Sequence, residues 1–294
     1  MEEKKTIRFT KMHGAGNDYI YVDAARYPIG NPAEAARLWS RSHTGIGSDG
    51  LILVMPSSKA DFRMRMFNSD GSEGAMCGNG ARCLAKFVHD HALSTSQKFT
   101  LETLAGIRTL QLHMTPNGSV NCVTVDMGQP AMSDSRLFKG TALAAGPDTE
   151  VTVEGKSYRG TFVSMGNPHF VIFVNDINSI DLAKEGKALE NLPLFPQGCN
   201  IEFACILADN HIRTRVWERG SGITQACGTG ACATLVAAVA TERCGHRASI
   251  VMDGGTLITE WNRTDHHIYL TGEAVTVYEG EINYSPEITG DMSY

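Results

Sequence analysis

The chain has 294 residues, of which 42% are hydrophobic and 20% are charged, and its net charge is −6. This is the composition of a globular protein that is long enough for two domains. The negative charge and the lack of a Lys/Arg cluster argue against a nucleic-acid partner, and no stretch approaches the roughly 20 apolar residues of a membrane span. With no apolar signal segment after Met1, we expect a cytoplasmic protein that has no membrane association.

The first half of the chain alternates strand signals with glycine-rich breaks. Ile7 and Phe9 alternate with polar residues as in a strand, and Pro32 suits the first turn of a helix. The predicted elements are strands within 6–23 around the loop His13–Asp18, a helix at 32–43, strands at 51–55 and 61–67, a helix after Cys77, and three strands within 98–126.

The second half repeats this order after an expected linker at 129–148. The predicted elements are a strand pair within 158–174, a helix at 180–190, strands at 200–207 and 211–217, a helix at 229–242 after Cys227, and three strands within 248–270. A last strand at 274–283 has no counterpart in the first half, and we expect it to return to the first domain.

An internal repeat with an offset of 150 residues explains this order. The stretch 75–81, which contains Cys77-Gly78-Asn79-Gly80, matches 225–231, which contains Cys227-Gly228-Thr229-Gly230. Between 61 and 81, six of 21 positions are identical to their partners, where chance gives about one or two. We therefore predict an α+β fold with two pseudo-symmetric, mostly antiparallel β barrel or roll domains. Each surrounds a central helix, and the domains face each other across a cleft. The first domain is expected at 1–128 plus 275–294, and the second at 129–274.

The repeated cysteines stand out among eight, and the spacing of these eight is not that of a zinc site. Cys77 and Cys227 each precede a helix, where unpaired N–H groups and a partial positive charge favour a thiolate or a bound carboxylate. A thiol with a pKa near 8.5 is then a mixture of thiol and thiolate at neutral pH. A base needs the thiolate and an acid needs the thiol, so the pair suits the inversion of a carbon centre by two-base proton transfer.

Polar residues in the neighbouring turns suit a zwitterionic substrate. Amide side chains offer both donors and acceptors, and an arginine holds a carboxylate through two hydrogen bonds. These residues are Asn17, Asn68, Asn167, Asn200, Glu218 and Arg219, with His169 as a group able to hold a proton near a cysteine.

At these residues the chain resembles the diaminopimelate epimerase family. The matching segments are Lys11–Tyr19, Phe67–Glu73, Met76–Cys83, Met165–His169, Asn200-Ile201, Glu218–Gly220 and Ala226–Gly230. The resemblance implies a reaction that needs no cofactor and no metal. The reaction interconverts LL- and meso-2,6-diaminopimelate, a precursor of lysine and of the cell wall. The resemblance also implies a homodimer.

The resemblance assigns a role to each candidate residue. Cys77 and Cys227 are the acid and base, and His169 and Glu218 tune their pKa values. Gly78, Asn79, Gly228, Thr229 and Glu218 hold the reacting end of the substrate, and Asn17, Asn68, Asn167, Asn200 and Arg219 hold the remainder. Ile223 departs from the family pattern, which usually has glutamate there, and Gly50 stands where some members have glutamine.

Two other functions are compatible with the sequence. One is a related cofactor-free racemase that acts on histidine or on several amino acids, although Arg219 and the asparagines favour diaminopimelate. The other is a non-catalytic amino-acid-binding protein, or a thiol redox protein in which Cys77 and Cys227 form a disulfide.

Overall fold

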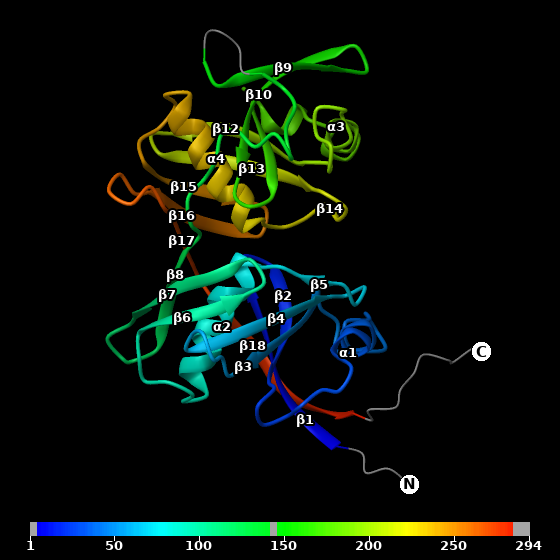
Figure 1. Cartoon of the computed structure of the whole chain (residues 1–294), viewed down its shortest axis with the longest axis vertical. Coiled ribbons are helices and arrows are strands. Elements are labelled where there is room, and N and C mark those ends of the chain that lie inside the picture. Colours follow the sequence, from blue (N-terminus) through cyan, green and yellow to red (C-terminus); the bar gives the residue numbers. More distant parts are fainter. Residues whose placement is uncertain (1–4, 142–145, 285–294) are drawn as a thin grey trace, which may run out of the picture. The chain divides into compact units, whose positions relative to one another are not determined.

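The computed structural model describes residues 5–141 and 146–284. The chain divides into two compact units, Met1–Val125 with Glu273–Tyr294, and Asp126–Gly272. These limits lie close to the domain limits expected from the repeat. Residues 142–145 of the expected linker lie outside the described residues. Figure 1 shows the path of the chain through each unit.

The first unit contains two helices and most of its strands in the order predicted. Its elements are β1 (Lys5–Gly14), β2 (Asn17–Asp23), α1 (Pro32–Trp39), β3 (Gly50–Met55), β4 (Phe62–Asn68), β5 (Glu73–Gly74), α2 (Gly78–Asp90), β6 (Lys98–Thr103), β7 (Gly106–Met114), β8 (Val120–Asp126) and, from the other end of the chain, β18 (Val275–Tyr284).

The second unit repeats the series. Its elements are β9 (Asp148–Val153), β10 (Lys156–Ser164), β11 (Pro168–Phe173), the 3-10 turn η1 (Ile177–Ser179), α3 (Leu182–Glu190), β12 (Asn200–Ala208), β13 (His211–Glu218), β14 (Gly222–Ile223), α4 (Gly228–Ala240), β15 (Arg247–Met252), β16 (Gly255–Trp261) and β17 (Ile268–Gly272).

Strand pairing shows that the two units share one topology. The strand order of the first is β18-β1-β2-β3-β4-β6-β7-β8, and that of the second is β9-β10-β11-β12-β13-β15-β16-β17. Pairing is mostly antiparallel. The first unit has two parallel pairs, β2–β3 and β4–β6, and they occupy the same places as the parallel pairs β11–β12 and β13–β15 of the second unit. The last strand returns to the first unit as predicted, where β18 pairs with β1 as β9 pairs with β10.

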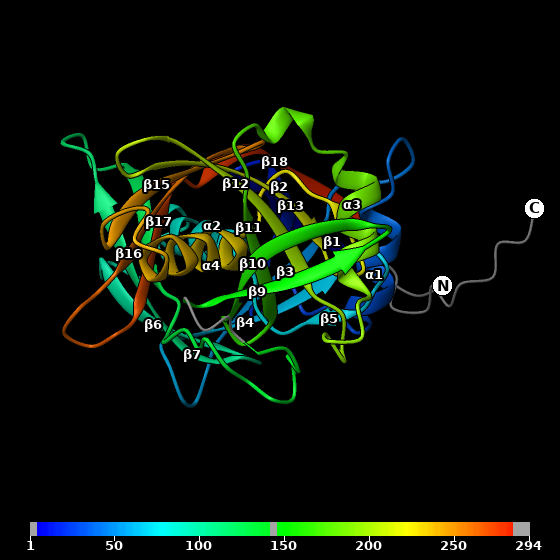
Figure 2. The ribbon, with the colours of Figure 1, turned by 90° about the horizontal axis from the view of Figure 1, so that it is seen from above.

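Each unit covers both faces of its sheet with a helix. In β2, Ile20 and Val22 belong to the core under α1, whereas Tyr21 stacks on Phe87 of α2. Both faces of the sheet are therefore shielded from solvent, which accounts for the continuous apolar runs of the central strands. In the second unit α4 is buried along most of its length, and Figure 2 shows it between β15–β17 and β10–β11.

One predicted helix is too long. The segment expected to be helical from Pro32 to His43 ends at Trp39. The backbone then turns, since His43 has a φ of 67° and the carbonyl of Trp39 accepts from the N–H groups of Ile46 and Gly47. Apolar residues at helical spacing could not reveal this end, because the turn depends on hydrogen bonds beyond the helix.

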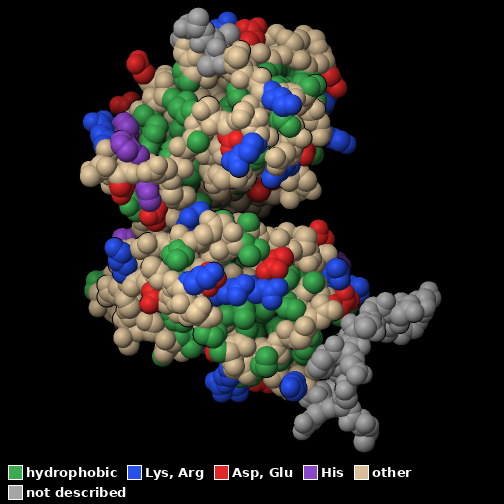
Figure 3. Space-filling view, in the orientation of Figure 1, with side chains coloured by type: hydrophobic (Ala, Val, Ile, Leu, Met, Phe, Trp, Pro, Cys, Tyr) green, Lys and Arg blue, Asp and Glu red, His purple; other side chains and the backbone are tan. Residues whose placement is uncertain are grey.

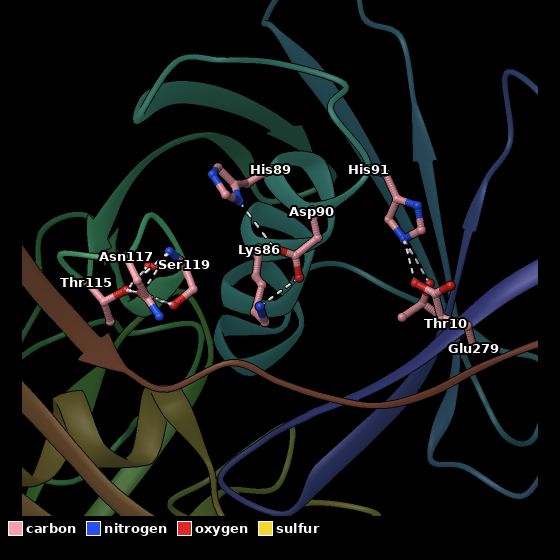
Figure 4. Close-up of polar contacts among 9 residues, drawn as sticks. All are labelled: Thr10, Lys86, His89, Asp90, His91, Thr115, Asn117, Ser119 and Glu279. Carbon is pink, nitrogen blue, oxygen red and sulfur yellow. Dashed lines mark hydrogen bonds and ion pairs between the residues drawn. The ribbon is translucent and has the colours of Figure 1, made fainter.

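The C-terminal end of α2 is tied to two strands of its own unit. His91, which caps this helix, contacts the Thr10 hydroxyl of β1 (3.0 Å) and lies 3.7 Å from the Glu279 carboxylate of β18 (Figure 4). The imidazole also packs on Phe87, with ring centroids 4.1 Å apart. These contacts hold the C-terminal end of α2, whose N-terminal end is capped by Cys77.

The surface in view has mixed charge. Figure 3 shows acidic and basic side chains interspersed over it. Among the described residues, no helix combines the length and the apolar character that a membrane crossing requires.

Candidate active site

Cys77 is the N-cap of α2. Its backbone is extended, with φ −131° and ψ 119°, and its Sγ accepts a hydrogen bond from the N–H of Gly80 (3.3 Å). A side chain at position 80 would collide with Ile52, because a Cβ there would lie 2.6 Å from its Cδ1. The glycine therefore lets the first turn approach the sheet closely, and that turn presents its N–H groups to the thiol.

Asn17 connects Cys77 to its surroundings. The Cys77 thiol donates to Asn17 Oδ1 (3.2 Å), and Asn79 Nδ2 donates to the same oxygen (3.3 Å). The buried Arg82 in turn donates to Asn79 Oδ1 (2.9 Å). Three residues predicted to belong to the site therefore form one hydrogen-bonded group in this unit.

Asp49 sets the orientation of that amide. Asn17 Nδ2 and the N–H of Asp18 both donate to Asp49 Oδ2, at 2.7 and 3.0 Å. Burial raises the pKa of the Asp49 carboxyl, although these two hydrogen bonds lower it. With Nδ2 held by Asp49, the amide oxygen of Asn17 faces the cysteine. The sequence analysis did not find Asp49, which looks like an ordinary residue of a glycine-rich turn.

Cys227 occupies the equivalent place at the start of α4. Its φ of −117° and ψ of 114° are close to those of Cys77, and its Sγ accepts from the N–H of Gly230 (3.3 Å). It is 6% exposed. Burial raises the pKa of the Cys227 thiol well above its ordinary value, and the charges of Glu218 and Glu202 raise it further. Hydrogen bonds from Thr229 and Gly230 act in the opposite direction.

A line of polar contacts runs from Cys227 into the sheet. Thr229 Oγ1 lies 3.4 Å from Cys227 Sγ and accepts from Asn167 Nδ2 (3.3 Å). Asn167 Oδ1 lies 3.2 Å from His169 Nε2, and His169 Nδ1 lies 2.7 Å from Glu202 Oε1. The side chains of His169 and Glu202 are fully buried. The structure therefore brings together four predicted site residues and adds a fifth, Glu202.

The turn after β13 carries Glu218 and Arg219. Burial raises the pKa of the Glu218 carboxyl, which also accepts a short hydrogen bond from Thr224. The N–H of Arg219 donates to Asn200 Oδ1 (2.9 Å), and its guanidinium donates to the Gln197 carbonyl (3.0 Å). Asn200 thus holds the turn from the start of β12.

The other predicted residues lie near these groups within their own units. Gly78 and Gly228 are the first residues of α2 and α4. Asn68 ends β4 and donates to Ser72 (3.0 Å), so its described contact is with the turn that precedes Cys77. Among the described residues, no group of three His, Cys, Asp or Glu side chains is placed to hold a metal ion.

Ile223 and its repeat partner, Glu73, differ in their contacts. In the first unit Glu73 forms two hydrogen bonds with Arg65, at 2.7 and 2.9 Å. In the second, Ile223 is 44% exposed, and Arg215 instead contacts Asp253 (3.4 Å). Asp253 thus supplies the carboxylate that residue 223 lacks.

The sequence of the chain is similar to that of known diaminopimelate epimerases. A model of the family described as diaminopimelate epimerase matches residues 9–133 and 161–277. A diaminopimelate epimerase of Phocaeicola vulgatus is 55% identical over 277 residues, which are 94% of this chain and 98% of that protein. One of Methanococcus maripaludis is 48% identical over 94% of this chain and 100% of that protein.

Solved structures show the same fold at low identity. A phenazine biosynthesis protein of the PhzF family from Bacillus anthracis matches with a TM-score of 0.69 and 21% identity, over 95% of this chain and 99% of that one. A hydroxyproline epimerase from Agrobacterium vitis matches with a TM-score of 0.68 and 16% identity, over 96% and 94% of the two chains. The fold is thus mostly β, with four α-helices in the part of the chain that the structure describes, and it occurs in proteins whose names indicate different functions.

Proposed function

The chain belongs to the diaminopimelate epimerase family, and we propose that it works with two cysteines and no cofactor. It is an isomerase that interconverts LL- and meso-2,6-diaminopimelate in lysine biosynthesis. The observation that supports the two-cysteine mechanism is the repeated half-site. Each unit begins its buried helix with a cysteine whose sulfur accepts from the N–H three residues later.

In this mechanism the cysteines exchange one proton each with the reacting carbon. One sulfur removes the α-hydrogen as a thiolate, and the other delivers a proton to the opposite face as a thiol. The substrate ends with inverted configuration, and the two cysteines have exchanged their protonation states. The mechanism requires both sulfurs to reach the same carbon.

The helix N-termini supply the remaining stabilisation. Removal of the α-hydrogen places negative charge next to the substrate carboxylate, and backbone N–H groups at Gly78, Asn79, Gly228 and Thr229 suit that charge. Glu218 is proposed to accept from the substrate ammonium. Burial makes a charge on its carboxyl costly, and a cationic partner beside the Thr224 hydroxyl would reduce that cost.

We assign the distal end of the substrate to amides and one arginine. Asn17, Asn68, Asn167, Asn200 and Arg219 are proposed to hold it, and Arg219 is suited to a carboxylate. The N–H of Arg219 is held by Asn200, and its guanidinium contacts the Gln197 carbonyl, so both ends of the residue are held. His169 is proposed to tune Cys227 through Asn167 and Thr229.

We also propose the domain limits 1–128 with 275–294 and 129–274, a homodimer and a cytoplasmic location. These rest on the internal repeat, on the composition and on the family resemblance.

The proposed activity is tested with pure LL-diaminopimelate and no added cofactor. We expect meso product, resolved by chiral chromatography, from the reduced wild type. Histidine and a panel of other single amino acids should remain unracemised, because they lack the distal group that Arg219 and the asparagines hold. Turnover of the panel with no meso-diaminopimelate formed would replace this function with that of a broader racemase.

A further inference from the structure

We propose that Glu202 is a positioning residue of the Cys227 half-site. It holds the His169 imidazole with a hydrogen on Nε2. His169 then donates to Asn167, Asn167 donates to Thr229, and Thr229 donates to Cys227 Sγ. The inference rests on the proposed function, in which Cys227 is one of the two acid/base groups. It adds a residue that is not among the proposed acid/base or substrate-binding groups.

The contacts determine where the protons lie. Asn167 Nδ2 donates to Thr229 Oγ1, so the amide presents its oxygen to His169. An amide oxygen only accepts, and therefore the 3.2 Å contact requires a hydrogen on Nε2. The Thr229 hydroxyl accepts from Asn167, which leaves its own hydrogen for Cys227 Sγ at 3.4 Å. Every donor in the chain then points toward the sulfur.

Glu202 is the group that holds the ring in this state. Its Oε1 is 2.7 Å from His169 Nδ1, so one proton lies between the nitrogen and the carboxyl while Nε2 keeps its own. Glu202 Oε2 is buried and has no hydrogen-bond partner among the described residues. A bare carboxylate with an unpaired oxygen is costly there, and the shared proton reduces that cost.

The local packing leaves the carboxyl little freedom. A Cβ at Gly230 would lie 2.7 Å from Glu202 Oε1, so the first turn of α4 closes directly over it. The ionisable groups that influence this half-site come from every side. They are His169 of β11, Glu202 of β12, Glu218 of β13 and Cys227 itself. Glu202 also influences the buried Cys199, together with Arg219 and Glu190.

The first unit has no histidine–glutamate pair at the equivalent positions. The residues that match His169 and Glu202 are Tyr19 and Ile52, and Asn17 points its oxygen at Cys77 while Asp49 holds its nitrogen. Cys77 thus contacts the oxygen of Asn17 directly, whereas the nitrogen of the equivalent Asn167 is linked to Cys227 through the Thr229 hydroxyl. Cys77 donates to an amide oxygen, whereas Cys227 receives a donor chain that partly offsets the cost of negative charge on its buried sulfur.

Nitrogen NMR of histidine-labelled protein tests the proton assignment without substrate. The His169 signals are identified by their loss in His169→Gln. We expect Nε2 to carry a hydrogen in the wild type and in Glu202→Gln, because a glutamine amide can donate to Nδ1. A bare Nε2 in the wild type would overturn the proposal. This readout does not depend on whether diaminopimelate is the substrate.

Steady-state kinetics of Glu202 variants then distinguish a positioning role of Glu202 from a role in stability alone. Glu202→Leu leaves Nδ1 without its partner, and we expect kcat to fall about ten- to a hundredfold with KM nearly unchanged. Glu202→Gln should stay within about threefold of the wild type, because its amide can still donate to Nδ1. Glu102→Leu, which removes a part-buried strand glutamate bonded to Ser57, is the stability control. Full activity in Glu202→Leu, or equal loss in the leucine and glutamine variants, would contradict the proposal.

Discussion

At the scale of single residues, the two repeated cysteines share a backbone position but differ in environment. Cys77 is half-buried and bonded to an amide oxygen, whereas Cys227 is 6% exposed and close to two carboxyl groups. A thiol whose pKa is raised stays protonated over a wider range, and its thiolate forms only as the pH rises toward that pKa.

We therefore expect iodoacetamide to modify Cys77 before Cys227 in the substrate-free enzyme at neutral pH. The thiolate fraction falls about tenfold for each unit by which a pKa exceeds the pH, so the rate at Cys227 should rise steeply as the solution becomes alkaline. Peptide mass spectrometry at intervals gives both rates. Equal labelling at neutral pH would show that burial does not protect Cys227.

The repeat predicted the local structure around the cysteines. The cysteines and the glycines after them match at a fixed offset, and the structure places them as equivalent helix starts. Glu202 and Asp49 were missed because each occurs in one half only. A single glutamate between Ile201 and Phe203 gives no sign that its face of the sheet carries His169.

At the scale of elements, an outer helix in each unit holds a turn that carries proposed substrate-binding residues. Arg37 of α1 donates to the Asp70 carbonyl (2.9 Å), next to Asn68. In the second unit Glu190, at the end of α3, accepts from Trp217 Nε1 (2.7 Å) and from the N–H of Gly220 (3.1 Å). The position of the turn with Glu218 and Arg219 therefore depends on a helix that carries none of the proposed site residues.

Glu190→Ala should loosen that turn. The loss of two hydrogen bonds costs about 1–3 kcal/mol of stability, and we expect KM for diaminopimelate to rise about tenfold as Glu218 and Arg219 lose their fixed position. The matched control is Glu185→Ala on the same helix, whose carboxylate bonds Lys156 and Tyr158. The control should lower stability and leave KM unchanged, and a parallel rise in KM in both variants would remove the special role of Glu190.

The elements themselves were largely predictable, because both faces of each sheet are covered and the apolar pattern is strong. The strand order was not, since parallel neighbours such as β4 and β6 are separated by a helix in the sequence. The early end of α1 was also missed, because tertiary hydrogen bonds determine it.

At the scale of the whole molecule, the chain is a duplicated unit whose halves have diverged around their cysteines. The common topology keeps a cysteine at each helix start, while the pairs Tyr19 with Ile52 and His169 with Glu202 make the halves unequal. An epimerase interconverts two different stereoisomers, so its two acid/base groups have no reason to be identical. The repeat explains why there are two cysteines, and the divergence explains why they are not equivalent.

The central claim is that both cysteines act on one carbon, and deuterium incorporation tests it most directly. The reaction is run in deuterium oxide from pure LL-diaminopimelate, with Cys122→Ala as the cysteine control. Wild type and control should form meso product that carries solvent deuterium at one α-carbon, whereas Cys77→Ala and Cys227→Ala should both stop forming that product. If either variant forms deuterated meso product at a rate near that of the wild type, its cysteine is not an acid/base group and the two-cysteine account is wrong.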